Sequence, residues 1–166
     1  MVAYDSKTKQ GKCIFCEIAS GRMQPMGNGK FWENDKYMAF LSPFPNTPGF
    51  TVLITKEHYQ SDVLQMPDKE LSGFVLEAKK IAKHLVEKLD DVGRVGLIME
   101  GTGINHAHIK LVPMTGTGYM KTGEWKQVHS SVNTYFAKYD GWIASNDGPR
   151  ADDSKLAELA KKLSIK

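Results

Sequence analysis

The chain has 166 residues, of which 41% are hydrophobic and 25% are charged, and its formal net charge is +3 at pH 7. These values are ordinary for a globular protein of one domain, and the charge is spread along the chain, which argues against a nucleic-acid-binding protein. No apolar run approaches the length of a membrane span, and residues 1–12 lack the apolar core of a secretory signal. We therefore expect a flexible N-terminal tail over residues 1–12 and a cytoplasmic protein without a membrane partner.

The first half of the chain predicts one short helix and three strands. Residues 13–20 are typical of a helix that ends at Gly21. Three prolines stiffen the loop over residues 42–49. The strands are expected at 30–34, 36–41 and 50–55, the first two as a hairpin.

The segment 68–90 predicts the longest helix. Its apolar residues recur every three or four positions, which is the period of an amphipathic helix. They are Leu71, Phe74, Val75, Ala78, Ile81, Ala82, Leu85, Val86 and Leu89. Pro67 lies near its start and Gly93 beyond its end, as is common at helix termini. With two further strands at 94–99 and 106–113, the chain predicts an α+β fold, in which a helix packs on an antiparallel sheet of about five strands.

After the last of these strands the pattern is looser. We expect residues 114–166 to form a C-terminal extension packed on the same domain, beginning with a loop rich in Gly and Thr over 114–123. A final helix is expected from Asp152 or Asp153 through Leu163, because Asp is a favoured N-cap residue.

The segment 104–113 carries the clearest functional signal. As a strand it places His106, His108 and Lys110 on one face and apolar residues on the other, because side chains alternate. Successive members of this row are about 6.5 to 7 Å apart. Such a row is able to engage phosphate or a metal ion, although two histidines on a half-exposed strand can also lack any function.

The only cysteines, Cys13 and Cys16, are three residues apart. This spacing is typical of metal binding or redox chemistry in a reducing compartment. A tetrahedral zinc site needs two more ligands, and a redox motif needs a βαβ context that the surrounding sequence does not predict. Two thiols without a function remain a third interpretation.

Together these segments resemble the histidine triad (HIT) family. The family signature is His-x-His-x-His followed by two apolar residues on a strand, which is similar to residues 106–112. Residues 13–21 look like the zinc-site start of bacterial-type members, and residues 48–58 look like the family's Pro-Gly-His-x-Leu-Val-Ile-Pro-Lys-x-His strand and turn. The resemblance covers a HIT-like domain at residues 13–113 and implies the same α+β fold.

The resemblance also implies a structural zinc ion. Members with this start bind zinc through both cysteines, the His of the Lys-x-His turn and the first His of the motif. Carried over to this chain, the ligands are Cys13, Cys16, His58 and His106. Two thiolates and two imidazoles make a closed tetrahedral set. The alternative is that His58 only caps a turn.

The middle His of the family motif is a nucleophile, which implies this role for His108. Its unprotonated nitrogen would attack the α-phosphorus of a purine nucleotide derivative and form a nucleotidyl-imidazole that water resolves. Hydrogen-bond donors must then stabilise the negative charge on the phosphoryl oxygens. Those expected are Lys110 and the loop residues Gly101, Thr102 and Gly103. The implied activity is a nucleotide hydrolase or nucleotidyl transferase, acting on a phosphoramidate, a dinucleoside polyphosphate or a similar compound.

The chain departs from the family pattern at several positions, including a shorter loop before the motif with Gly103 in place of its usual Ser. Lys110 replaces the third His, and an ammonium with its usual pKa donates but does not shuttle protons. Phe50 replaces a further His, and Ser42 stands where many members have an Asp or Asn that bonds the ribose. These departures support a second hypothesis, a zinc-stabilised nucleotide-binding protein with little or no catalysis.

The base of the nucleotide is expected in an apolar slot. The candidate residues are Ile18, Phe40, Leu41 and Phe44, for which packing in the core is the alternative role. Family members usually form homodimers, so the resemblance implies a homodimer here as well.

Overall fold

The computed structural model describes Lys7, residues 10–127, Ser131, residues 135–138, Ile143 and Asp152. The chain divides into two compact units, residues 1–125 and 126–166. Every helix and strand described below belongs to the first unit. The helix expected from Asp152 or Asp153 lies almost entirely outside the described residues, as does most of the expected tail over 1–12.

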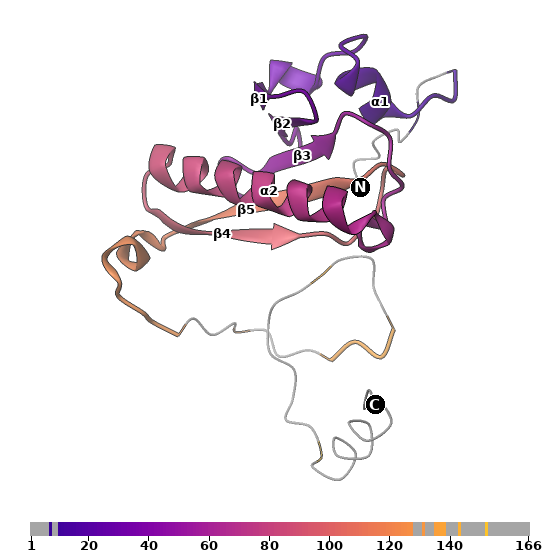
Figure 1. Cartoon of the computed structure of the whole chain (residues 1–166). Helices are drawn as coiled ribbons and strands as arrows, with labels where there is room; N and C mark the ends of the chain where they lie inside the picture. The colour runs from indigo at the N-terminus through magenta and orange to yellow at the C-terminus, as the bar shows by residue number, and fades with distance from the viewer. Residues whose placement is uncertain are drawn as a thin grey trace. The chain divides into compact units, whose positions relative to one another are not determined.

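The fold is α+β, as predicted, with a five-stranded antiparallel sheet (Figure 1). The helices are α1 (Ile14–Ala19) and α2 (Asp68–Lys88), with short 3-10 helices η1 (Met26–Asn28), η2 (Val63–Gln65) and η3 (Gly118–Thr122). The strands are β1 (Lys30–Glu33), β2 (Tyr37–Leu41), β3 (Thr51–Thr55), β4 (Val92–Ile98) and β5 (His108–Thr115). Their order in the sheet is β1-β2-β3-β5-β4, and each neighbouring pair is antiparallel.

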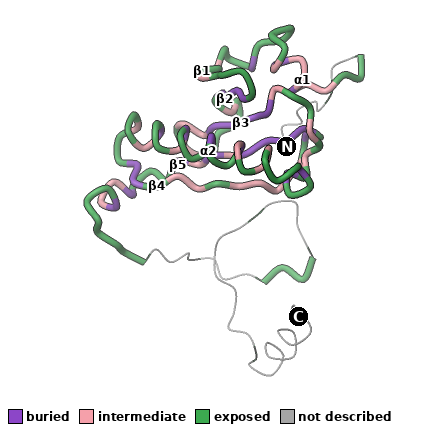
Figure 2. Tube along the Cα trace, viewed as in Figure 1, coloured by how far each residue is buried: buried purple, intermediate pink, exposed green. Residues whose placement is uncertain are grey.

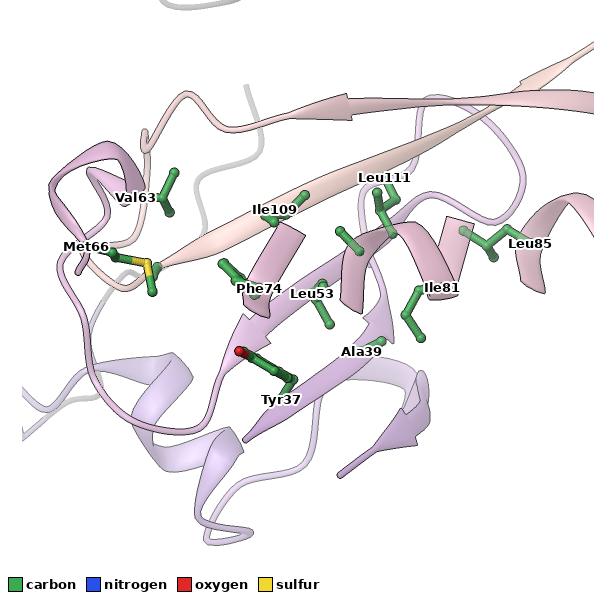
Figure 3. Close-up of a cluster of buried hydrophobic side chains, with 12 residues drawn as sticks. Tyr37, Ala39, Leu53, Val63, Met66, Phe74, Ile81, Leu85, Ile109 and Leu111 are labelled. Atoms are coloured by element: carbon green, nitrogen blue, oxygen red, sulfur yellow. The ribbon is translucent and has the colours of Figure 1, made fainter. Parts of the chain in front are cut away.

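The sheet buries a core on each of its two faces, because side chains alternate along a strand. The row Ala39, Leu53 and Ile109 packs under α2. Figure 3 shows Phe74 and Ile81 of α2 lying over this part of the sheet. The neighbouring rows point to the opposite face, where α1 covers a second apolar cluster. That cluster consists of Phe15, Ile18, Met38, Phe40, Val52, Ile54 and Ile104.

The register places His108 and Lys110 on the face covered by α1. His108 pairs with Ile54 of β3, and Lys110 pairs with Val52. Both partners belong to the cluster under α1. The fold therefore separates a structural core under α2 from a face that combines apolar and chemically active side chains.

The helix α2 forms where its sequence predicts, and its first turn is acidic. Asp68 and Glu70 lie in the first turn and Lys88 in the last, which complements the helix dipole. Its buried face includes Phe74, which stacks on Tyr37 with ring centroids 5.4 Å apart. The opposite face is exposed in Figure 2. Among the described residues, no helix combines the length and apolar character needed to cross a membrane.

Some element boundaries differ from the predicted ones. Strand β4 begins at Val92 rather than at residue 94, and it includes Gly93, which lies beyond the end of α2 as expected. A Cβ at Gly93 would lie 2.0 Å from the carbonyl oxygen of Thr117, so only glycine allows η3 to pack there. Strand β5 begins at His108 rather than at residue 106, and it continues to Thr115. Part of the expected loop over 114–123 is thus strand and 3-10 helix.

Truncation of Phe74 tests the core under α2. Because its side chain is fully buried, Phe74→Ala should lower the free energy of unfolding by about 3–5 kcal/mol. The matched control is Leu76→Ala on the same helix, where a side chain that is 58% exposed should change it by less than about 0.5 kcal/mol. Denaturant unfolding followed by circular dichroism measures both, and equal losses would contradict this packing.

Candidate functional site

Four metal-ligating side chains from separate segments meet near the point where β3 ends and β5 begins. Cys13 is the N-cap residue of α1, and Cys16 follows within its first turn. His58 comes from the loop after β3, and His106 lies two residues before β5. The candidate ligand atoms of these four residues all lie within 4.8 Å of one another. The cluster can therefore hold a metal ion.

The individual distances within this cluster are short. The Sγ of Cys16 lies 3.3 Å from Nδ1 of His58 and 3.5 Å from Nδ1 of His106. The Sγ of Cys13 lies 3.6 Å from Nδ1 of His106, and the two Nδ1 atoms are 3.3 Å apart. One nitrogen of each imidazole therefore points at a common centre together with both sulfur atoms.

The backbone fixes the orientation of His106. Its Nε2 donates to the carbonyl oxygen of Thr55 at 2.8 Å, so Nδ1 presents its lone pair to the cluster. Burial lowers the pKa of His106 to about 4, so that the ring is neutral near pH 7. Burial and the neighbouring Cys13 raise the pKa of the Cys16 thiol to about 11. A bound cation would have to displace that proton, because the thiolate is the metal ligand.

The same backbone holds His108 in one tautomer. The side chain is 4% exposed, and its Nδ1–H donates to the carbonyl oxygen of His106 at 2.7 Å. This bond leaves Nε2 without a proton. Burial lowers the pKa of His108, and the charge of Lys110 lowers it further, while Glu100 acts in the opposite direction. The ring of Phe15 packs edge-on against it with centroids 5.7 Å apart. At neutral pH, His108 is therefore a rigid, neutral imidazole with a nucleophilic nitrogen.

Lys110 forms an ion pair with Glu100, a residue that the sequence alone did not single out. The Lys110 ammonium and the hydroxyl of Thr102 both donate to Oε1 of Glu100, the latter at 3.1 Å. Burial, the largest single influence, raises the pKa of this carboxyl, but the hydrogen bonds from Lys110, the backbone and Thr102, together with the charge of Lys110, hold the pKa below its usual value. The Glu100 side chain is only 10% exposed, and no described residue bonds its buried Oε2. Glu100 lies two residues after Ile98, the last residue of β4, which pairs with Lys110, so the register of β4 and β5 is the signal that could have found it.

The residues expected around a nucleotide base are only partly brought together. Phe40 and Ile18 are buried in the cluster under α1, on the face of His108. Leu41 is 41% exposed, and the strand alternation directs it away from that face. Phe44 is 46% exposed, and its backbone N–H donates to the hydroxyl of Ser42 at 3.2 Å.

The loop before the motif is tightly constrained. Gly101 and Gly103 both have positive φ angles, of 66° and 90°. A Cβ at Gly101 would lie 2.7 Å from the carbonyl oxygen of Ser61, so a larger residue would displace the loop. The Asn105 side chain accepts a hydrogen bond from the N–H of Ser61 at 3.0 Å. These contacts restrict the backbone conformation of the loop and therefore the positions of Glu100 and Thr102.

Comparison with known proteins extends these observations. Residues 27–117, more than half of the chain, match the HIT domain model. The chain is 32% identical over 125 residues to an uncharacterised HIT-like protein of Methanocaldococcus jannaschii, covering 70% of this chain and 91% of that protein.

Two solved structures show the same architecture. A HIT family hydrolase from Legionella pneumophila is 25% identical with a TM-score of 0.51, over 61% of this chain and 91% of that one. A HIT family protein from Bacillus anthracis is similar in fold, with 24% identity and a TM-score of 0.60 over 93% and 97% of the two chains. The match to the domain model, together with these relatives, shows that the chain belongs to the histidine triad (HIT) family.

Proposed function

We propose that the protein is a nucleotide hydrolase or nucleotidyl transferase that acts at the α-phosphate of a purine nucleotide derivative through His108. The observation that carries this proposal is the hydrogen bond from Nδ1 of His108 to the carbonyl oxygen of His106, at 2.7 Å. It fixes the tautomer whose Nε2 can attack phosphorus. Membership of a family that includes hydrolases agrees with this activity.

The reaction would proceed in two displacements. In the first, Nε2 of His108 forms a bond to the α-phosphorus, and the bond to the leaving group breaks with its electron pair on that group. In the second, water attacks the same phosphorus, the P–N bond breaks and the electron pair returns to Nε2. The water loses a proton to solvent, and a nucleoside monophosphate is released. Each step is easier than direct displacement by water.

The surrounding residues would bind the substrate. Lys110 and the loop residues Gly101, Thr102 and Gly103 would contact the phosphoryl oxygens, and Ser42 the ribose. Phe40 and Ile18, which share the face of His108, would contact the base. The side chain of Leu41 is directed away from this face, so it would not contact the base.

The metal that we propose for the cluster is zinc, in a structural role. Zinc–sulfur bonds of about 2.3 Å and zinc–nitrogen bonds of about 2.0 Å place tetrahedral S and N ligands about 3.5 Å apart. The observed separations of 3.3 and 3.5 Å from Cys16 Sγ to the two Nδ1 atoms agree with this. A closed set of four protein ligands leaves no position for substrate, so the ion would support α1 and His106. Free thiols persist best in a reducing compartment, and we therefore place the protein in the cytoplasm. The homodimer is proposed only from membership of the family.

A zinc-stabilised nucleotide-binding protein without turnover is the alternative. One observation favours it: Lys110 is held by Glu100, and an ammonium carries hydrogen-bond donors but no acceptor. Such a protein would bind nucleotide at the same face but would not need the nucleophilic nitrogen of His108.

Removal of a ligand tests the zinc site. Purified protein should contain one zinc per chain, and Cys16→Ser should weaken zinc binding more than about 100-fold and lower the Tm, because an open ligand position remains. Because the cysteine thiols must lose their protons to bind zinc, the affinity for zinc should decrease when the pH is lowered from about 8 to about 6. Elemental analysis and competition with a chelator measure both effects. The control is Ser20→Ala at the C-cap of α1, which should bind zinc like the wild type; zinc-free, fully stable wild-type protein would contradict the site.

Turnover of a small panel tests the activity. Adenosine phosphoramidate, a diadenosine polyphosphate, an ADP-sugar and adenylyl sulfate would each be incubated with the protein, and AMP measured by chromatography. At least one compound should release AMP, and His108→Ala should slow that release more than about 1,000-fold because the nucleophile is lost. The control is His84→Ala on the exposed face of α2, which should leave the rate unchanged. Failure of zinc-loaded, folded wild type on every compound would support the binding protein instead.

A further inference from the structure

The ion pair between Lys110 and Glu100 joins two adjacent strands beside the candidate nucleophile. Lys110 lies in β5 opposite Ile98, the last residue of β4, and Glu100 follows two residues later. Lys110 and His108 are two residues apart on one strand, so both project from the same face at a separation of about 6.5 to 7 Å. The carboxylate therefore holds the ammonium next to the nucleophile.

Close backbone contacts constrain the loop that carries the Glu100 carboxylate. Gly101 packs so closely on Ser61 that a Cβ would lie 2.7 Å from its carbonyl oxygen. On the other side of the loop, the N–H of Ala107 donates to the carbonyl oxygen of Tyr59 at 2.8 Å. The loop is thus attached to the segment after β3 at two points, which restricts the movement of Glu100.

The side chain of Glu100 is also constrained. Thr102 donates to Oε1 at 3.1 Å, and the carboxylate is 10% exposed. A buried carboxylate without a cationic partner is strongly destabilising, so Lys110 is kept in the pair. The ammonium has three N–H donors, and its side chain is 27% exposed, so the bond to Glu100 leaves donors for a phosphoryl oxygen.

We infer that Glu100 is a positioning residue, which fixes the Lys110 ammonium beside Nε2 of His108 so that it can donate to the phosphoryl oxygens of a nucleotide. This inference rests on the proposed function. A flexible Lys side chain loses much conformational freedom when it orders. Glu100 imposes that order before substrate binds, so the cation is preorganised for the charge that develops in the transition state. Thr102 supports the arrangement through Glu100.

A double-mutant cycle tests this role. Glu100→Gln keeps the shape of the side chain but removes its charge, and it should lower kcat about 10-fold or more while KM changes less than about threefold. In a Lys110→Met background the same Glu100→Gln change should lower kcat less than about twofold, because there is no ammonium left to position. Thr102→Val should cause a smaller loss in kcat, of about two- to threefold.

The substrate is the panel compound that wild-type protein turns over fastest, and Tm and zinc content are measured for every variant. The control is Glu70→Gln, which breaks the surface pair of Glu70 with Lys36, of 3.1 Å, and should leave kcat unchanged. Wild-type kcat after Glu100→Gln, or an equal loss with and without Lys110, would overturn the inference. If the Glu100→Gln variant does not fold, Thr102→Val is compared in the wild-type and Lys110→Met backgrounds instead. A loss of kcat that is larger when Lys110 is present supports the inference, and an equal loss in both backgrounds overturns it.

A separate readout distinguishes failure of this inference from failure of the proposed function. If wild-type protein turns over no compound, the same cycle is measured as AMP affinity by calorimetry. A loss of affinity on Glu100→Gln that is at least about threefold larger with Lys110 than with Met at this position supports positioning without catalysis. Identical effects in both backgrounds contradict it.

Discussion

One histidine connects the parts of this site, and the rest of the arrangement depends on it. His106 donates from Nε2 to the carbonyl oxygen of Thr55, and its Nδ1 faces the two cysteines and His58. Its own backbone carbonyl accepts the proton of His108 Nδ1. A metal ion bound by the cluster would thus fix the residue that orients the nucleophile, although the ion would not contact the substrate. The chemistry that we propose at His108 and the packing of the N-terminal helix α1 would therefore be linked through a single peptide segment.

The alternation of the strands assigns a separate function to each face of the sheet. The α2 face carries Ala39, Leu53 and Ile109, which are all fully buried and contribute to stability through packing. The other face places His108 and Lys110 beside apolar side chains under α1. Low polarity on that face would strengthen the proposed interaction of the Lys110 ammonium with a phosphoryl group, provided that the ammonium is already in position. The carboxylate that would position it comes from the adjacent strand end, so the sheet register itself builds the site.

Much of this could be predicted from the sequence, because periodicity reports which face a residue occupies. The length and apolar face of α2, the five strands and the row of His108 and Lys110 all follow from local patterns. Contacts between distant segments are not encoded in such patterns. Glu100 could not be recognised as the partner of Lys110 without the register between β4 and β5, and the close packing of η3 on Gly93 depends on a contact with a distant segment. The alternation of β2, taken to its end, would have directed Leu41 away from the site.

The central claim is that His108 attacks phosphorus, and the most direct test is to observe the intermediate. Wild-type protein is mixed with the fastest substrate, quenched within one turnover under conditions that preserve a phosphorus–nitrogen bond, and analysed by intact-mass and peptide mass spectrometry. We predict a mass increase of one nucleotidyl group on the peptide that contains His108, which disappears as the substrate is consumed. Turnover without such an adduct, or an adduct on another residue, would contradict the account.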